Sequence, residues 1–235
     1  MSLLRLFKRG YQDVLNILYP RLCINCGRVL YPHEDLLCHH CLSSMTLTNF
    51  NPSDNPLYNR LAAIVPLQYA TALFLFDQHG AVQNLIHRLK YQGRQDVGKL
   101  MADFTKNYFD EKSFHPAFDY IIPVPLHPEK QKKRGYNQMT VFGENLGNYF
   151  GVIYGENILL RYINTSSQTK KTAAQRRQNV AGAFVIPNPE KYSGKHFLII
   201  DDVITTGATI EACAETIIKQ VPDAKVSVLA MAVVL

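Results

Sequence analysis

The chain has 235 residues, of which 47% are hydrophobic and 19% are charged, and its formal net charge is +6. This composition is typical of a globular protein and excludes a disordered chain, and no apolar run approaches the roughly 20 residues that span a bilayer. Residues 1–19 mix charged with apolar side chains and lack the apolar core of a signal peptide, so we expect a cytoplasmic protein without a transmembrane segment. The positive charge suits an anionic ligand or nucleic acid, although solubility alone would also account for it.

The N-terminal residues have the periodicity of an amphipathic helix that ends at Pro20. Its apolar face consists of Leu4, Phe7, Tyr11, Val14, Leu15 and Leu18. We expect this face to pack against the module that follows. A helix lying on a membrane surface is the weaker alternative, because the polar face carries few cations.

Two Cys-x-x-Cys pairs come next, separated by eleven residues. The four cysteines are Cys23, Cys26, Cys38 and Cys41. In a chain without an export signal, this spacing favours a metal site over disulfides, and four thiolates complete a tetrahedral structural Zn²⁺ site. A redox pair and an iron–sulfur cluster are the alternatives. The fifth cysteine, Cys213, lies on the apolar face of a predicted helix, so we expect it in the core.

From Ser43 to Asn59 the chain becomes rich in Ser, Thr, Asn and Pro, which predicts a linker and a domain boundary. We expect two units, with the N-terminal helix and the cysteine module in residues 1–55 and a larger domain in residues 56–235.

The larger domain shows strand and helix patterns in alternation. The predicted strands are 69–77, 119–125, 158–163, 183–186, 197–200 and 225–235, and the predicted helical stripes are 82–89, 97–108, 139–150 and 210–221. This alternation predicts an α/β fold with a parallel sheet flanked by helices. If the sheet is parallel, the strand before Pro123 should end beside the strand that reaches Asp201.

The most informative stretch begins with four apolar residues, Phe197 to Ile200, which are typical of a strand buried on both faces. Asp201 and Asp202 follow where that strand should end, and a hydroxyl-rich glycine turn leads into a helix. A helix N-terminus suits phosphate, and carboxylates suit sugar hydroxyls, so the stretch predicts a ribose 5-phosphate site. The alternatives are Asp residues that cap the next helix and a receiver-type phosphorylation pocket.

Residues 199–209 closely resemble the motif of type I phosphoribosyltransferases, which bind phosphoribosyl pyrophosphate (PRPP). The resemblance implies that Asp201 and Asp202 hold the ribose 2- and 3-hydroxyls. It also implies that the following turn wraps the 5-phosphate and that Mg²⁺ accompanies the pyrophosphate. The residues of this turn are Thr205, Thr206, Gly207, Ala208 and Thr209.

Two basic segments could complete the site. Residues 130–138 contain Arg134, whose forked guanidinium suits pyrophosphate or an acceptor, and a solvated charge run is the alternative. Residues 164–179 contain Arg177 and could close over the site as a lid, and a surface loop is the alternative.

The order of motifs over nearly the whole chain resembles the ComF family of competence-associated phosphoribosyltransferase-like proteins. The motifs are the four cysteines, Leu89-Lys90-Tyr91, residues 122–127, residues 134–138, residues 172–179 and the PRPP motif. The resemblance implies a type I phosphoribosyltransferase-like parallel sheet with a small N-terminal zinc-binding module, and a link to DNA uptake and natural transformation.

Two kinds of function remain open from the sequence. An enzyme would transfer a phosphoribosyl group and release pyrophosphate, with Asp201, Asp202, Arg134 and Arg177 as the expected catalytic residues. No residue is an obvious general base, which also fits a non-catalytic partner that binds PRPP or single-stranded DNA, or a scaffold that docks other competence or DNA-processing proteins.

Overall fold

The structure of this chain, a computed structural model, describes residues 19–161 and 182–235. The predicted N-terminal helix and Arg177 lie outside the described residues. None of the helices in the described ranges is long and apolar enough to cross a membrane.

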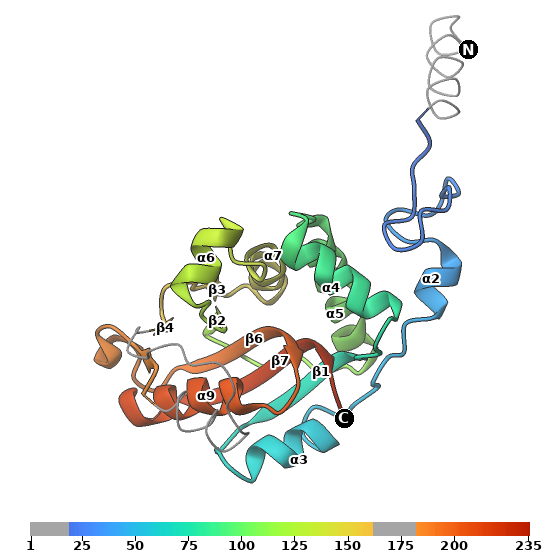
Figure 1. The fold of residues 1–235 in the computed structure, drawn as a ribbon. Coiled ribbons are helices and arrows are strands. Elements are labelled where there is room, and N and C mark those ends of the chain that lie inside the picture. The colour runs from blue at the N-terminus through green and yellow to red at the C-terminus, as the bar shows by residue number, and fades with distance from the viewer. Residues whose placement is uncertain (1–18, 162–181) are drawn as a thin grey trace, which may run out of the picture.

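A five-stranded sheet forms the centre of the molecule, in the order β1-β7-β6-β2-β3 (Figure 1). Every neighbouring pair of its strands is parallel, so the predicted parallel sheet is confirmed. The strands are β1 (Tyr69–Leu75), β2 (Tyr120–Pro123), β3 (Ile153–Tyr154), β6 (His196–Ile204) and β7 (Lys225–Val233). As expected, the end of β2 lies beside the acidic strand, because Pro123 is in register with Ile200.

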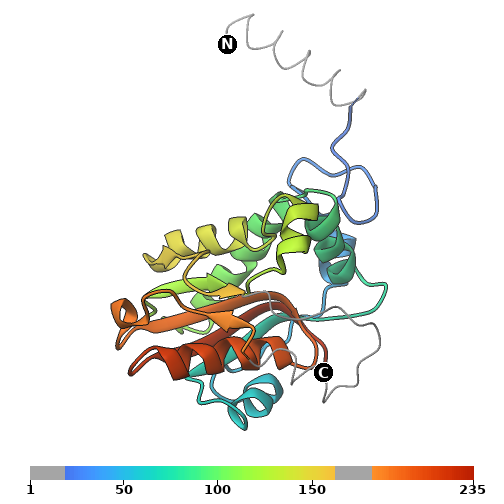
Figure 2. The ribbon, with the colours of Figure 1, turned by 60° about the vertical axis from the view of Figure 1, so that its left-hand side comes forward.

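Helices cover both faces of the sheet (Figures 1 and 2). The helices α4 (Ala81–Tyr91), α5 (Asp96–Glu111) and α7 (Thr140–Phe150) lie on one face, and α3 (Pro56–Ala62) and α9 (Ala208–Gln220) on the other. The side chains of β6 alternate between two cores: Leu198 and Ile200 pack with α4, α5 and α7, whereas Phe197 and Ile199 pack with α3 and α9. The core position expected for Cys213 is confirmed, because it is fully buried on α9.

Several short elements differ from the sequence prediction. Only Leu160–Arg161 (β4) and Phe184–Val185 (β5) form strands in the described parts of 158–163 and 183–186, and they pair antiparallel outside the main sheet. The sequence did not predict β3 because two residues carry no periodicity. Short helices α2 (His39–Ser43) and α6 (Pro128–Arg134) and a 3₁₀ turn, η1 (Pro189–Tyr192), complete the described elements.

The predicted linker lies along the outer edge of β1. The N–H of Thr48 donates to the carbonyl of Leu73 at 2.8 Å, and the N–H of Leu75 donates to the carbonyl of Thr46 at 2.9 Å. These bonds satisfy an edge that would otherwise be free to pair with another chain. The segment itself is thus held to the main sheet. The division into units 1–55 and 56–235 stays a prediction.

Candidate functional site

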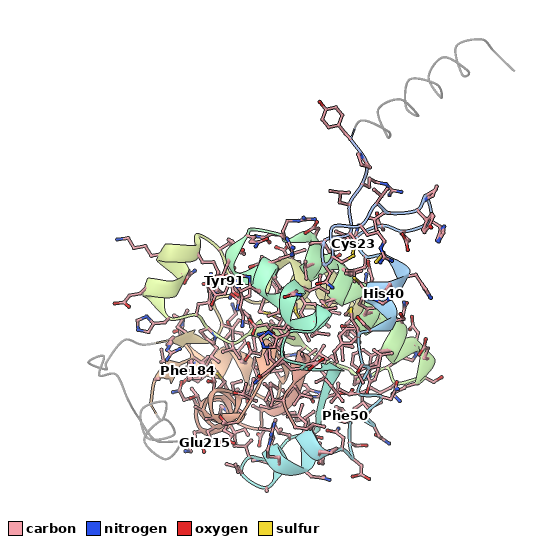
Figure 3. All side chains as sticks on the ribbon, turned by 45° about the vertical axis from the view of Figure 1, so that its right-hand side comes forward. Cys23, His40, Phe50, Tyr91, Phe184 and Glu215 are labelled. Atoms are coloured by element: carbon pink, nitrogen blue, oxygen red, sulfur yellow. The ribbon has the colours of Figure 1, made fainter. Side chains whose placement is uncertain are left out.

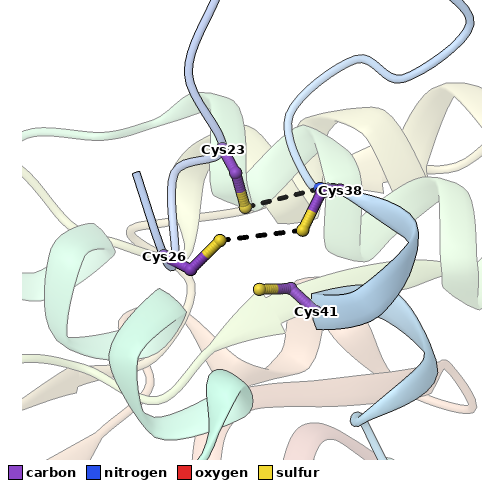
Figure 4. A group of neighbouring side chains, drawn as sticks. All are labelled: Cys23, Cys26, Cys38 and Cys41. Atoms are coloured by element: carbon purple, nitrogen blue, oxygen red, sulfur yellow. Dashed lines mark hydrogen bonds between the residues drawn. The ribbon is translucent and has the colours of Figure 1, made fainter. Parts of the chain in front are cut away.

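The structure brings the four predicted cysteines together in one cluster (Figure 4). Their sulfur atoms all lie within 4.8 Å of one another, and the Sγ atoms of Cys26 and Cys38 are 3.7 Å apart. A tetrahedral zinc ion with bonds of about 2.3 Å would place its sulfur ligands about 3.8 Å apart. All five cysteines of the chain are free of disulfides. The donor set and its spacing therefore fit a metal ion such as zinc.

Local hydrogen bonds hold the cysteine cluster in place. The carboxylate of Glu34 accepts the N–H of Tyr31 at 2.8 Å and that of His39 at 2.6 Å, which fixes the loop between the two pairs. Burial acts to raise the pKa of Cys23, but the N–H groups of Cys26, Cys38 and Asn25 outweigh it and lower the pKa to about 6. A thiolate that is stabilised in this way is a ready metal ligand.

Asp201 and Asp202 lie inside β6, which runs on to Ile204 instead of ending before them as the sequence predicted, and they occupy different environments. Because side chains alternate along a strand, Asp202 continues the face that packs against α4 and α7, and Asp201 continues the face that packs against α9. The Asp202 side chain is only 6% exposed, and its Oδ1 lies 2.6 Å from Nζ of Lys90. Its Oδ2 accepts a hydrogen bond of 2.7 Å from Nε2 of Gln138. The Asp202 carboxylate is thus paired with a lysine and hydrogen-bonded to an amide within the protein.

Asp201 has no salt bridge to any residue that the structure describes. Its Oδ1 accepts the N–H of Asp202 at 2.9 Å. Burial and the negative charge of Asp202 raise the pKa of Asp201 to about 8, against the opposing effects of that N–H group and of Lys90. Burial and the neighbouring charge thus favour the protonated form of this carboxyl group.

A small hollow lies directly after β6, where the strand gives way to α9. It is open to solvent and is lined by Asp201, Val203, Ile204, Thr205, Thr206, Gly207, Ala208, Thr209 and Ile210. Gly207 precedes α9 with a φ of +86°, and a Cβ atom there would lie 2.8 Å from Leu61 Cδ2. The turn therefore needs glycine both for its left-handed backbone and for the close approach of α3. The N–H groups in the first turn of α9 suit an anion.

Arg134 belongs to the same network as Asp202. It is the last residue of α6, donates to Oε1 of Gln138, and its guanidinium lies 5.4 Å from the centre of the Tyr91 ring. Gly135 follows with a φ of +77°, which turns the chain so that the Tyr136 hydroxyl can donate to the carbonyl of Leu89. In this structure Arg134 orients Gln138, and Gln138 in turn holds Asp202.

Sequence reasoning missed two contributors to this network. Lys90 entered only as part of the motif Leu89-Lys90-Tyr91 and Gln138 only as part of the basic segment 130–138, so neither was predicted to contact Asp202. The available signal was a lysine beside the buried end of an apolar helical stripe, at Leu89. Only the packing of α4 against the sheet shows that this lysine reaches an acid on β6.

Comparison with known proteins agrees with this geometry. The family model described as phosphoribosyl transferase domain matches residues 141–234. DNA utilization protein YhgH of Salmonella typhi is 26% identical over 201 residues, which cover 84% of this chain and 78% of that protein. Competence protein F of Haemophilus influenzae is 31% identical over 139 residues, covering 57% and 61%. Competence protein ComFC of Bacillus subtilis is 23% identical over 154 residues, covering 65% and 60%.

These matches support the sequence-based resemblance to the ComF family. The chain combines a phosphoribosyltransferase-like fold, whose parallel sheet is flanked by helices, with a cysteine cluster near the N-terminus. The matched domain includes β6, the hollow at its end and α9.

Proposed function

We propose that this ComF-like protein binds Mg²⁺–PRPP at the end of β6 and transfers its phosphoribosyl group with release of pyrophosphate, in a process linked to DNA uptake. One observation carries the proposal: an acidic pair and a glycine turn meet at the carboxyl end of a central parallel strand, where one hollow is lined by Asp201 and by Thr205 to Thr209. Ligands of open parallel sheets bind at this edge. The competence and DNA utilization names of the relatives support the link to DNA.

Each part of the hollow has a role in this proposal. The turn from Thr205 to Thr209 offers N–H and hydroxyl donors to the 5-phosphate, while Asp201 faces the ribose. Asp202 keeps its contacts with Lys90 and Gln138, and its oxygens retain lone pairs that can accept from a second ribose hydroxyl. Magnesium arrives as part of the substrate complex on the pyrophosphate, and binding would hold the ribose while positive charge develops at its C1 carbon.

Calorimetric titration with Mg²⁺–PRPP tests the binding step. We expect the double variant Asp201→Asn, Asp202→Asn to bind at least tenfold more weakly than the wild type, because an amide is a weaker acceptor for hydroxyl groups than a carboxylate. Asp103→Asn is the control, since that carboxylate pairs with Lys106 on α5. Equal affinity of the wild type and the double variant would contradict the assignment of the acidic pair.

A non-catalytic partner that binds PRPP or single-stranded DNA is the second candidate. The observation that favours it is the composition of the hollow, whose only ionisable lining residue in the described part of the chain is Asp201. Pyrophosphate release from PRPP, screened over candidate acceptors with and without single-stranded DNA, separates the two. Binding of PRPP without release under all conditions would favour the partner role, and DNA binding through phosphate contacts would weaken as salt increases.

The cofactor and compartment are part of the same proposal. Structural zinc in the cysteine cluster would supply folding energy to a segment that is too short for a core of its own. The free thiols suit the reducing environment of the cytoplasm.

A further inference from the structure

Helix α4 touches both of the sites described above. Near its N-terminus, Nδ2 of Asn84 donates to Oδ1 of Asn25 at 2.9 Å. In its last turn, Lys90 contacts Asp202 and the ring of Tyr91 lies under Arg134. The helix therefore runs from the cysteine cluster to the acidic end of β6.

Asn25 connects this helix to the metal ligands themselves. It lies between Cys23 and Cys26, and its Nδ2 donates to Sγ of Cys41 at 3.2 Å. The side-chain amide of Asn25 thus donates an N–H to a sulfur of one Cys pair, and its oxygen accepts an N–H from Asn84. Such contacts around a metal site orient its ligands, and here they also extend to a helix of the larger domain.

Packing adds to this connection. The cysteines and the apolar side chains of their module belong to the same hydrophobic core as the buried face of α4. The module contributes Cys23, Ile24, Leu37, Cys38, Cys41 and Met45, and α4 contributes Ala81, Val82, Leu85, Ile86 and Leu89. In the view of Figure 3, Cys23 and Tyr91 both lie above Phe184 and Glu215. A displacement of the module could therefore reach α4 through this shared core as well as through Asn25 and Asn84, because close-packed cores transmit displacement.

We propose that the metal-filled cysteine module positions α4, through Asn25 and Asn84, so that Lys90 holds Asp202 in place for the ribose. Lys90 is a positioning residue in this scheme, and the metal is coupled to the ribose site along one helix. The ligand in this inference rests on the proposed function, but the coupling itself concerns only residues of this chain.

Hydrogen exchange tests the coupling without any ligand. In the zinc-loaded full chain, we expect Asn84→Ala to raise amide exchange in residues 85–91 and also at the end of β6, in residues 201–204. Asn145→Ala is the matched control, because it removes one part-buried amide hydrogen bond, to the carbonyl of Val141, from within α7. Faster exchange confined to α4, or no change in either segment, would overturn the proposal.

A second experiment uses the reciprocity of coupled binding sites. If the sites are coupled, Mg²⁺–PRPP should slow zinc release to a chelator from the wild type, and Asn84→Ala should remove that protection and weaken PRPP binding by roughly fivefold. Equal protection in the wild type and in Asn84→Ala would overturn the inference. If the wild type binds no PRPP in calorimetry, the proposed function fails, and the exchange experiment still decides on the coupling.

Discussion

The cysteine cluster and the acidic end of β6 were both predicted from short motifs, but they are built in different ways. The four cysteines lie close together in the sequence, and two turns bring their sulfurs within 4.8 Å of one another. Asp201 and Asp202 are neighbours in the sequence, yet their partners differ, and Gln138 reaches Asp202 across 64 residues. A motif that supplies all of its own ligands can be interpreted locally, whereas the state of an acidic pair depends on the elements packed around it.

The largest effect is expected at the cysteine cluster. We predict one zinc per chain in protein purified without chelators, and loss of the metal on substitution of Cys41→Ser together with Cys38→Ser. Structural zinc contributes on the order of 10 kcal/mol of binding free energy, so the variant should lose the fold of its N-terminal module. Metal analysis and hydrogen exchange of residues 20–45 measure both outcomes. The zinc assignment would be refuted if the wild type contained no metal and its residues 20–45 exchanged at the same rate as in the variant.

The next largest effect concerns the ion pair between Lys90 and the buried carboxylate of Asp202. Asp202→Ala leaves Lys90 without its partner, and removing one member of such a pair costs about 3 kcal/mol. Lys90→Met combined with Asp202→Ala should recover most of this loss, because no unpaired charge remains. Urea unfolding gives both values. The exposed pair of Glu215 and Lys219 is the control, since breaking it should change stability by less than about 1 kcal/mol.

A smaller effect is expected in the glycine turn after β6, from Thr205 to Thr209. Gly207→Ala forces a side chain into a left-handed backbone and against Leu61, which should cost about 2 kcal/mol of stability and weaken PRPP binding. Gly93→Ala is a matched control, because Gly93 has a φ of +68° but nothing lies within 4 Å of the added Cβ. If both variants lose the same stability, the contact with α3 does not constrain the turn.

The smallest expected effect is a pH dependence of stability that comes from Asp201 rather than from Asp202. Folding raises the pKa of Asp201 from 3.8 to about 8, so the folded chain binds this proton more tightly than the unfolded chain does. Its contribution to stability is therefore present at low pH and is lost as the pH rises from about 4 to about 8.

Asp201→Asn should remove this pH dependence. Because the side chain is partly exposed, we expect the variant to be more stable than the wild type by only about 1 kcal/mol at pH 8.5, with little difference at pH 5. Urea unfolding at the two pH values measures the change. A variant that is less stable than the wild type at pH 8.5 would show that Asp201 is charged and stabilised in the folded protein.

Much of the fold could be predicted because its long elements have strong periodicity. The strands β1, β6 and β7 and the helices α4, α5, α7 and α9 all overlap the predicted regions, although β6 runs on to Ile204, beyond the predicted end of the strand. Short elements escaped prediction: α3 depends on Asn55, whose side chain accepts the N–H of Tyr58 at 2.9 Å, and on Pro56 at its first position. The predicted linker runs alongside β1, because its backbone groups form hydrogen bonds with this strand. The sequence does not show that β1 is an edge strand.

The sequence by itself determined the four cysteines of the cluster, the alternating α/β order, and the acidic pair with its glycine turn. These features depend on spacing and side-chain type within a few residues. Only the tertiary structure decided that Asp202 has a lysine partner, whereas Asp201 has none among the residues that the structure describes. The reason is that a strand sends adjacent side chains to opposite faces, and α4 brings a lysine to only one of them. The same helix joins that lysine to the cysteine module, a connection between distant segments that no local pattern encodes.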